Sequence, residues 1–169
     1  MTTDKWLARY AKLARFIADE WSKDPTTKVG AVLVGINRRH IALGYNGFPP
    51  GVGDTWDRLV DRGIKHRLTQ HAERNVLDNA WFDTRGSLLV TTMFPCSECV
   101  KSMVSRGVLM VYTPRPVTWE PWKSDADLST MLMKEAGIHV KYHDVETGRP
   151  EEVGDRPVVQ SRELSGPDR

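Results

Sequence analysis

The sequence predicts an α/β fold in which a mixed five-stranded sheet carries helices on both faces. Segments with helical periodicity alternate with short segments rich in β-branched residues, in the order α-β-β-α-β-α-β-α-β. Strands joined by helical crossovers form a sheet that is covered on both sides. A short turn joins the first two strands, so we expect that pair to be antiparallel and the remaining strands to be parallel.

The first helix is predicted from one apolar face, which we expect to pack on the core or on another subunit: Trp6, Tyr10, Leu13, Ile17 and Trp21. Asp24-Pro25 ends it, because proline disfavours the helical conformation in the preceding residue. Strands follow at 29–36 and 41–45, with a turn at 37–39. Residues 46–57 are rich in Gly and Pro and predict an irregular loop, which in a compact domain is often functional.

After a polar stretch, helices are predicted at 71–82, 96–106 and 128–136, and strands at 87–92, 108–113 and 138–142. Gly107 and Gly137 follow two of these helices, as is common at helix ends. We interpret residues 1–145 as one domain. Residues 146–169 form a polar tail that is expected to be disordered or to lie on a neighbouring subunit.

Composition excludes several classes of protein. A net charge of +2, with no long run of like charges, disfavours binding to polymeric nucleic acid. No apolar stretch has the length of a signal peptide or of a membrane span. The only two cysteines lie three positions apart, which disfavours a disulfide scaffold and indicates a reducing, cytoplasmic setting.

Two motifs carry the chemistry: His71-Ala72-Glu73 and Pro95-Cys96-Ser97-Glu98-Cys99. His71, Cys96 and Cys99 are ligands that zinc prefers, and a set of three leaves a position open for water, as in catalytic sites. Glu73 is placed to act as general base and then as general acid. The pattern is typical of zinc deaminases.

Two alternatives remain open at this point. A fourth ligand (His40, His66, His139 or His143) would close a structural zinc site in a binding protein without activity. A thiol oxidoreductase would use the Cys96/Cys99 pair without metal.

The chain resembles the deoxycytidylate (dCMP) deaminases of the cytidine deaminase superfamily. Four blocks carry the resemblance: residues 24–31 (DPTTKVGA), 44–51 (GYNGFPPG), 71–75 (HAERN) and 94–99 (FPCSEC). It implies an α/β/α sandwich with a five-stranded mixed sheet. It also implies one zinc ion per subunit and deamination of dCMP to dUMP for thymidylate synthesis, with Glu73 moving the protons.

The resemblance implies further contacts and partners. The backbone of Ala72 would bind the base and Asn46 the deoxyribose, while Lys28 is a candidate phosphate contact. The loop 47–54, with Gly47 and Asp54, is the expected effector site. A homo-oligomer, typically a hexamer, would be activated by dCTP and inhibited by dTTP, with Mg²⁺ accompanying the triphosphate.

One segment departs from the family pattern. Where the family has a short stretch with a substrate-facing aromatic residue, residues 113–122 contain Trp119 and Trp122, either of which is a candidate for that role. The identity of the base is therefore open among dCMP, 5-substituted dCMP, dCTP, free cytosine and tRNA adenosine.

Overall fold

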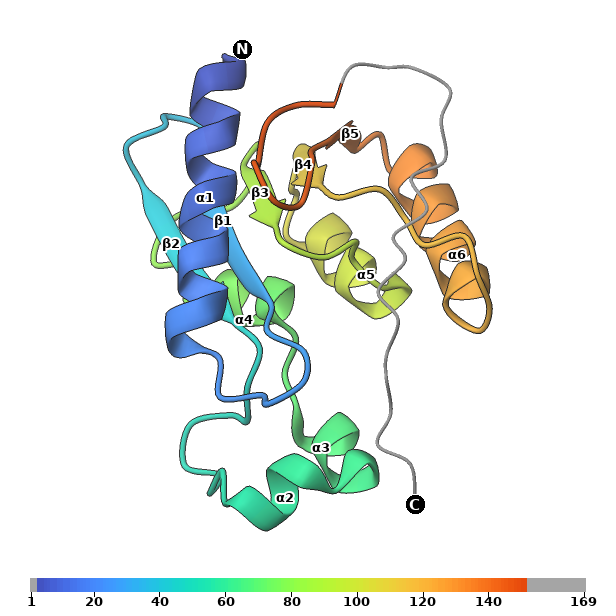
Figure 1. The fold of residues 1–169 in the computed structure, drawn as a ribbon. Helices are drawn as coiled ribbons and strands as arrows, with labels where there is room; N and C mark the ends of the chain where they lie inside the picture. Colours follow the sequence, from blue (N-terminus) through green and yellow to red (C-terminus); the bar gives the residue numbers. More distant parts are fainter. Residues whose placement is uncertain (1–2, 152–169) are drawn as a thin grey trace.

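A computed structural model describes residues 3–151 and has the predicted α/β architecture (Figure 1). The five strands are β1 (Gly30–Val34), β2 (Ile41–Tyr45), β3 (Leu88–Thr91), β4 (Met110–Thr113) and β5 (His139–Tyr142). The helices in the described part are α1 (Asp4–Trp21), α2 (Trp56–Val60), α3 (Arg62–Leu68), α4 (Ala72–Asp78), α5 (Ser97–Ser105) and α6 (Trp122–Glu135). Of the predicted tail, residues 152–169 lie outside the described residues.

The strands are arranged in the order β2-β1-β3-β4-β5. β1 is antiparallel to both of its neighbours, whereas β3/β4 and β4/β5 are parallel. The expectation that only the first pair is antiparallel is therefore wrong at β1/β3. The crossover from β2 through α4 passes over β1 and places β3 on its other side. As a result β2, β3, β4 and β5 all run in one direction, and their carboxyl ends lie at one edge of the sheet.

Helices cover both faces of this sheet and create two apolar layers (Figure 1). On one face α1 packs Leu7, Tyr10 and Ala14 against Val32 and Val90. On the other face α4, α5 and α6 pack around side chains that include Leu33, Leu89, Val100 and Met133. β1 is buried along its whole length because it is covered from both sides.

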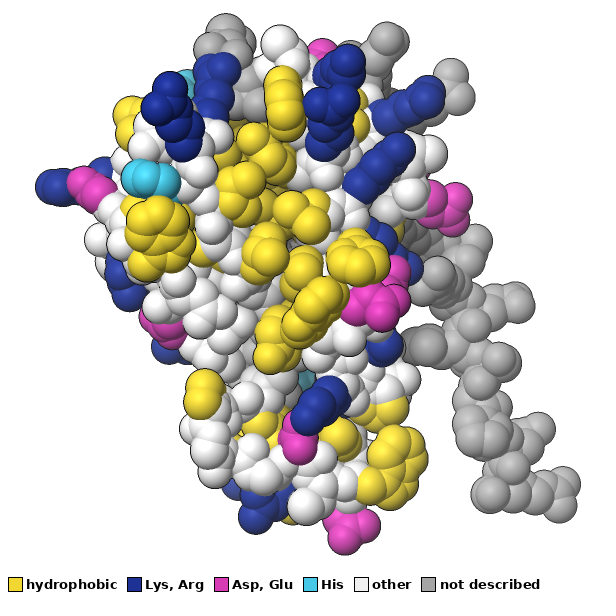
Figure 2. All heavy atoms as spheres, turned by 90° about the vertical axis from the view of Figure 1, so that its left-hand side faces the viewer, with side chains coloured by type: hydrophobic (Ala, Val, Ile, Leu, Met, Phe, Trp, Pro, Cys, Tyr) yellow, Lys and Arg dark blue, Asp and Glu magenta, His cyan; other side chains and the backbone are white. Residues whose placement is uncertain are grey.

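The side of the molecule formed by α1 and β2 has a hydrophobic surface, which Figure 2 shows. Tyr10 and Ile17 are buried as the helical periodicity predicts, but Trp6 and Trp21 at the two ends of α1 are each 47% exposed. β2 is an edge strand whose residues are alternately exposed and buried. Ile41, Leu43 and Tyr45 lie on the face of the sheet that α1 covers, but they remain partly exposed to solvent.

Several element boundaries differ from the predictions. α2 begins within the loop predicted at 46–57, and α3 lies in the polar stretch, where no element was predicted. Neither helix has the apolar periodicity that predicts a helix from sequence. Asp61 caps α3 by accepting a hydrogen bond from the Ile64 N–H group. α4 ends at Asp78 instead of residue 82, and α6 begins at Trp122 instead of residue 128. None of the helices within residues 3–151 combines the length and the apolar character that crossing a membrane requires.

Candidate active site

The first half of the site lies at the start of α4. His71 is the N-cap residue, and Ala72 and Glu73 follow in the first turn, where both are buried. Gly44 of β2 lets this helix approach the sheet: a Cβ atom there would lie 2.5 Å from Val76 N and 2.7 Å from Ala72 O. Gly44, in the second of the four blocks, is therefore needed to seat α4 and its functional residues.

The second half lies at the start of α5, which follows β3. Cys96 is the N-cap residue and Cys99 lies one turn later, so both thiols face the same direction. Val100 and Met103, on the same helix, are fully buried in the core and hold the helix in place. The structure thereby brings together residues that are 25 positions apart in the sequence.

The three predicted ligands converge. The Sγ atoms of Cys96 and Cys99 each lie 3.4 Å from His71 Nδ1, and all three ligand atoms lie within 4.8 Å of one another. In a tetrahedral site with usual Zn–S and Zn–N bond lengths, a thiolate sulfur and an imidazole nitrogen are about 3.5 Å apart. The donor set and its spacing therefore fit zinc.

The electrostatics of the two thiols differ. Hydrogen bonding from the Cys99 thiol and then from His71 outweighs burial and lowers the pKa of Cys96 to about 4. The pKa of Cys99 is raised because Cys99 is the donor to Cys96 and because it is buried. The Cys96 interaction also raises the pKa of His71 despite desolvation. Of the three groups, Cys96 is therefore the one that these interactions shift toward its metal-binding form, the thiolate.

Glu73 lies next to the three ligands but is not one of them. Its Oε2 atom is 3.6 Å from Cys99 Sγ, and the residue is only 3% exposed. Burial raises the pKa of its carboxyl group above the ordinary value. A carboxyl group with a raised pKa can both accept and return a proton near neutral pH.

A closed structural zinc site, one of the two alternatives, finds no support among residues 3–151. No fourth His, Cys, Asp or Glu belongs to the described cluster of His71, Cys96 and Cys99. His143, for example, is buried and directs Nε2 to Thr91 O and Nδ1 to Asp144 O, each at 3.0 Å. Cys96 and Cys99 are free thiols rather than a disulfide.

Asn46, the predicted deoxyribose contact, follows β2 and is buried in a hydrogen-bond network. Its Oδ1 atom accepts from the Ser22 hydroxyl at 2.7 Å and from the Val29 N–H group at 2.8 Å, and its Nδ2 group donates to Thr27 O at 2.8 Å. These bonds leave one Nδ2 proton for another partner. Asn46 therefore joins the loop after β2 to the segment before β1.

The other predicted contacts lie around this edge with different partners. Lys28 Nζ donates to Asp19 O at 2.8 Å, and Asp54 forms an exposed ion pair with Lys23 at 2.5 Å. Gly47 exchanges two backbone hydrogen bonds with Gln70, the residue before His71. The loop predicted as the effector site is thus hydrogen-bonded to the residue that precedes the predicted ligand His71.

The tryptophan-rich segment follows β4, so it leaves the sheet at the same edge. Trp119 and Trp122 are both about half exposed. Trp119 lines a small cleft together with Arg115, Val117, His143 and Glu151. Arg115 pairs with Glu151 at 2.5 Å. In this arrangement neither indole is buried in the core.

Sequence reasoning missed two acidic side chains that support the site. Asp24 forms a buried ion pair with Lys65 of α3 at 3.0 Å. Asp125 of α6 accepts hydrogen bonds from Ser97, between the two cysteine ligands. Their partners are 41 and 28 positions away, so no local signal in the sequence indicates them.

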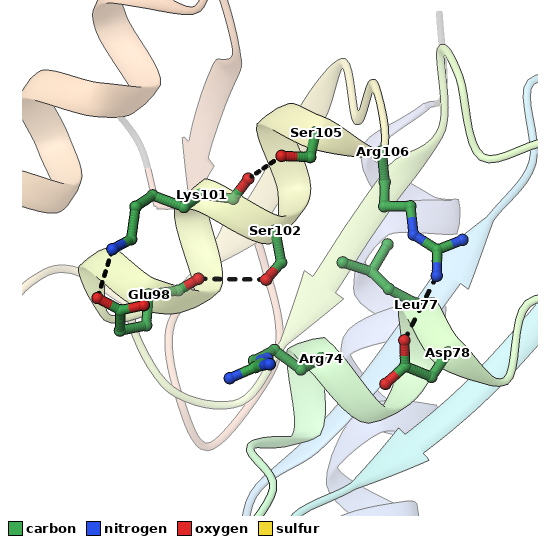
Figure 3. A pocket seen from close by; sticks show the side chains of 8 residues that line it. All are labelled: Arg74, Leu77, Asp78, Glu98, Lys101, Ser102, Ser105 and Arg106. Carbon is green, nitrogen blue, oxygen red and sulfur yellow. Dashed lines mark hydrogen bonds and ion pairs between the residues drawn. The ribbon is translucent and has the colours of Figure 1, made fainter.

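A separate groove lies between α4 and α5 (Figure 3). Charged side chains line it, and two pairs form across it or along its wall: Lys101 with Glu98 at 2.5 Å and Arg106 with Asp78 at 3.4 Å. Its lining residues include neither the three predicted metal ligands nor Glu73. The chemistry of the site therefore does not lie in this groove.

Comparison with known proteins now identifies the pattern. A family model described as the cytidine and deoxycytidylate deaminase zinc-binding region matches residues 4–113. The chain is 35% identical over 140 residues to an "uncharacterized deaminase in luxG 3′ region" of Aliivibrio fischeri, a match that covers 82% of this chain and 93% of that protein. It is 32% identical over 105 residues to the deoxycytidylate deaminase of Mus musculus, which covers 59% of each.

A solved structure agrees with these matches. The dCMP deaminase of the cyanophage S-TIM5, in complex with dCMP and dUMP, is similar with a TM-score of 0.66 and 26% sequence identity. That match covers 85% of this chain and 100% of the phage chain. The chain thus matches the whole phage enzyme but little more than half of the length of the mouse enzyme.

Proposed function

Because the chain belongs to the cytidine and deoxycytidylate deaminase family, we propose that it hydrolyses dCMP with one water molecule to dUMP and ammonia. The observation that carries this proposal is the convergence of His71, Cys96 and Cys99 beside the buried carboxyl group of Glu73. Three N and S ligands leave room for a reacting water, and the carboxyl group is at hand to move its protons.

His71, Cys96 and Cys99 would hold zinc, which when bound supplies a Lewis acid that makes water a nucleophile near neutral pH. Glu73 takes the proton from the attacking water and delivers it to the ring nitrogen, and a second proton passes to the departing amine. Burial of Glu73 keeps its proton affinity high enough for both directions of transfer. The N–H group of Ala72, at the start of α4, is our candidate for holding the carbonyl oxygen of the base.

The choice of dCMP rests on the sheet edge and on the relatives. Asn46, Cys96 and the tryptophan-rich segment follow β2, β3 and β4, whose carboxyl ends share one edge, and ligands of α/β sheets bind at such edges. The mouse relative is named a deoxycytidylate deaminase, and the phage enzyme was crystallised with dCMP and dUMP. We assign the free Nδ2 proton of Asn46 to the deoxyribose and Lys28 to the phosphate.

We further propose a homo-oligomer that works in the cytoplasm, where its thiols stay reduced. The loop 47–54 is our candidate for binding dCTP or dTTP, with Mg²⁺ on the triphosphate. Its connection to Gln70 through Gly47 offers a short route from an effector to His71. Activity measured against dCTP and dTTP, with and without Mg²⁺, tests this regulation.

The deciding experiment is ammonia release by the zinc-loaded protein from dCMP, 5-methyl-dCMP, dCTP, cytidine, cytosine and tRNA. We expect dCMP to give the highest kcat/KM. The Glu73→Gln variant keeps the shape of the side chain and should retain zinc but lose at least about 100-fold in kcat. Undiminished turnover by this variant would refute the mechanism, and a clear preference for another substrate would reassign the base.

A further inference from the structure

Both hydrogen bonds described for Asp125 of α6 come from Ser97, at the start of α5. One of its carboxylate oxygens accepts from the Ser97 backbone N–H group at 3.1 Å, and the other accepts from the Ser97 hydroxyl at 2.5 Å. We propose that Asp125 is a positioning residue that holds the first turn of α5 so that Cys96 and Cys99 face His71. The inference rests on the proposed function only in that the site holds zinc.

The start of α5 needs an acceptor that its own sequence does not provide. The first N–H groups of a helix have no partner within the helix, and the N-cap side chain usually accepts one of them. Here the N-cap residue is Cys96, which makes no capping bond, because its sulfur is directed to His71. The carboxylate of Asp125, from another helix, accepts a hydrogen bond from one of these unpartnered groups, the Ser97 N–H.

Two helix ends meet at this carboxylate. Asp125 lies in the first turn of α6, and Ser97 is the first residue of α5. The N-terminal end of a helix carries partial positive charge, so one carboxylate stabilises both ends. α6 is itself anchored, since Ala126 and Met133 are buried. The acceptor is therefore held by a part of the fold that does not depend on metal.

Ser97 is well placed to transmit this restraint to the ligands. It follows Cys96 directly and precedes Cys99 by two positions, within the same turn. Bonds to both its backbone and its side chain restrict rotation of that turn about the helix axis. Without them the turn is free to fray, and fraying would move the two sulfur atoms relative to His71.

The test uses the zinc-loaded protein and needs no nucleotide. Zinc affinity is measured by competition with a chelator, and cobalt-substituted protein reports thiolate coordination through its charge-transfer absorption. The Asp125→Ala variant should bind zinc about 10-fold more weakly, because replacing a residue that orients a metal ligand typically lowers the metal affinity by at least that factor. Its cobalt spectrum should show weaker thiolate absorption. Asp125→Asn keeps an acceptor for the Ser97 N–H group and should recover most of the affinity.

Asp127 provides the matched control. It lies on the same helix, and within residues 3–151 its carboxylate pairs only with Lys123, at an exposed position. Asp127→Ala should leave both readouts at wild-type values. If Asp125→Ala behaves like Asp127→Ala, the inference is wrong.

A second pair of variants covers the case in which Asp125→Ala does not fold. Ser97→Ala removes only the hydroxyl bond and should weaken zinc binding. Ser102→Ala removes a hydroxyl bond to the Glu98 carbonyl within α5 and should not weaken it. Equal zinc affinity in these two variants would overturn the inference. A wild-type protein that binds zinc but releases no ammonia from dCMP would refute the proposed function and leave this result standing.

Discussion

Replacing Lys65 by methionine should destabilise the protein by about 3 kcal/mol. The side chains of Lys65 and Asp24 are only 9% and 8% exposed, so the carboxylate would remain buried without its cation. Removing one partner of a buried ion pair costs roughly 3–5 kcal/mol. Asp24 retains the N–H groups of Thr26 and Thr27 and the Thr26 hydroxyl, at 2.8–3.0 Å, which places the loss at the lower end.

The assay is urea unfolding at pH 7 with the same excess of zinc for each variant. The double variant Lys65→Met with Asp24→Asn carries no buried charge and should lose less than the two single variants together. Lys123→Met, which breaks an exposed pair, should change the free energy of unfolding by less than about 1 kcal/mol. A loss as small for Lys65→Met as for Lys123→Met would refute the reasoning.

The pH dependence of this loss follows from Asp24. Burial alone would raise the pKa of Asp24, but the Thr26 and Thr27 N–H groups and the Lys65 ammonium outweigh it and lower the pKa below 3.8. A carboxyl group with a lowered pKa stabilises the fold above its unfolded value and loses that effect as the pH falls through its folded value. The difference between wild type and Lys65→Met should therefore stay constant from pH 8 to pH 5 and shrink only below about pH 4.

Three further changes test how the site is built. Gly44→Ala should displace α4, because the new Cβ atom would lie 2.5 Å from Val76 N. The purified variant should contain less zinc than wild type and be roughly 1–3 kcal/mol less stable. A full zinc content would contradict this account of the packing. Asn46→Ala should cost about 2–4 kcal/mol in unfolding experiments, since the Val29 N–H group and the Thr27 carbonyl lose their partner and the Ser22 hydroxyl keeps only the longer bond to the backbone carbonyl of residue 46. An unchanged melting temperature would show that these bonds are replaced. Chelation of zinc should expose Cys96 to alkylation before the fully buried Cys99, as followed by mass spectrometry, and simultaneous modification would contradict the described burial.

The sequence was sufficient for most strands and for the metal ligands because both leave local signals. Both ends of β2 were predicted correctly from its flanking turns. His, Cys and Cys at the spacing of His71, Cys96 and Cys99 are typical of a metal site. Helix α3 left no such signal. Lys65 is its buried residue, and lysine in a sequence normally indicates the surface; its burial depends on Asp24, 41 positions away.

The direction of β1 relative to β3 illustrates a second kind of limit. The hydrophobic pattern of a strand that is covered on both faces is the same in parallel and antiparallel neighbours. Only the path of the chain determines whether β1 and β3 are parallel or antiparallel, and that path depends on how α4 packs over β1 and β2. Asp125 is a similar case, because an acidic residue in the first turn of a helix is explained by that helix alone until α5 is seen beside it.

The convergence of the zinc ligands is itself a consequence of the chain path. α4 runs away from the edge where β3 ends, and its seven residues span about 10 Å; the four residues of β3 return over about 13 Å. The start of α5 therefore comes back to the start of α4, and His71 meets Cys96. The same edge also receives the chain after β2 and after β4, which carry Asn46 and the tryptophan-rich segment. The topology thus accounts for why the predicted zinc ligands, Asn46 and the tryptophan-rich segment lie at one edge of the sheet.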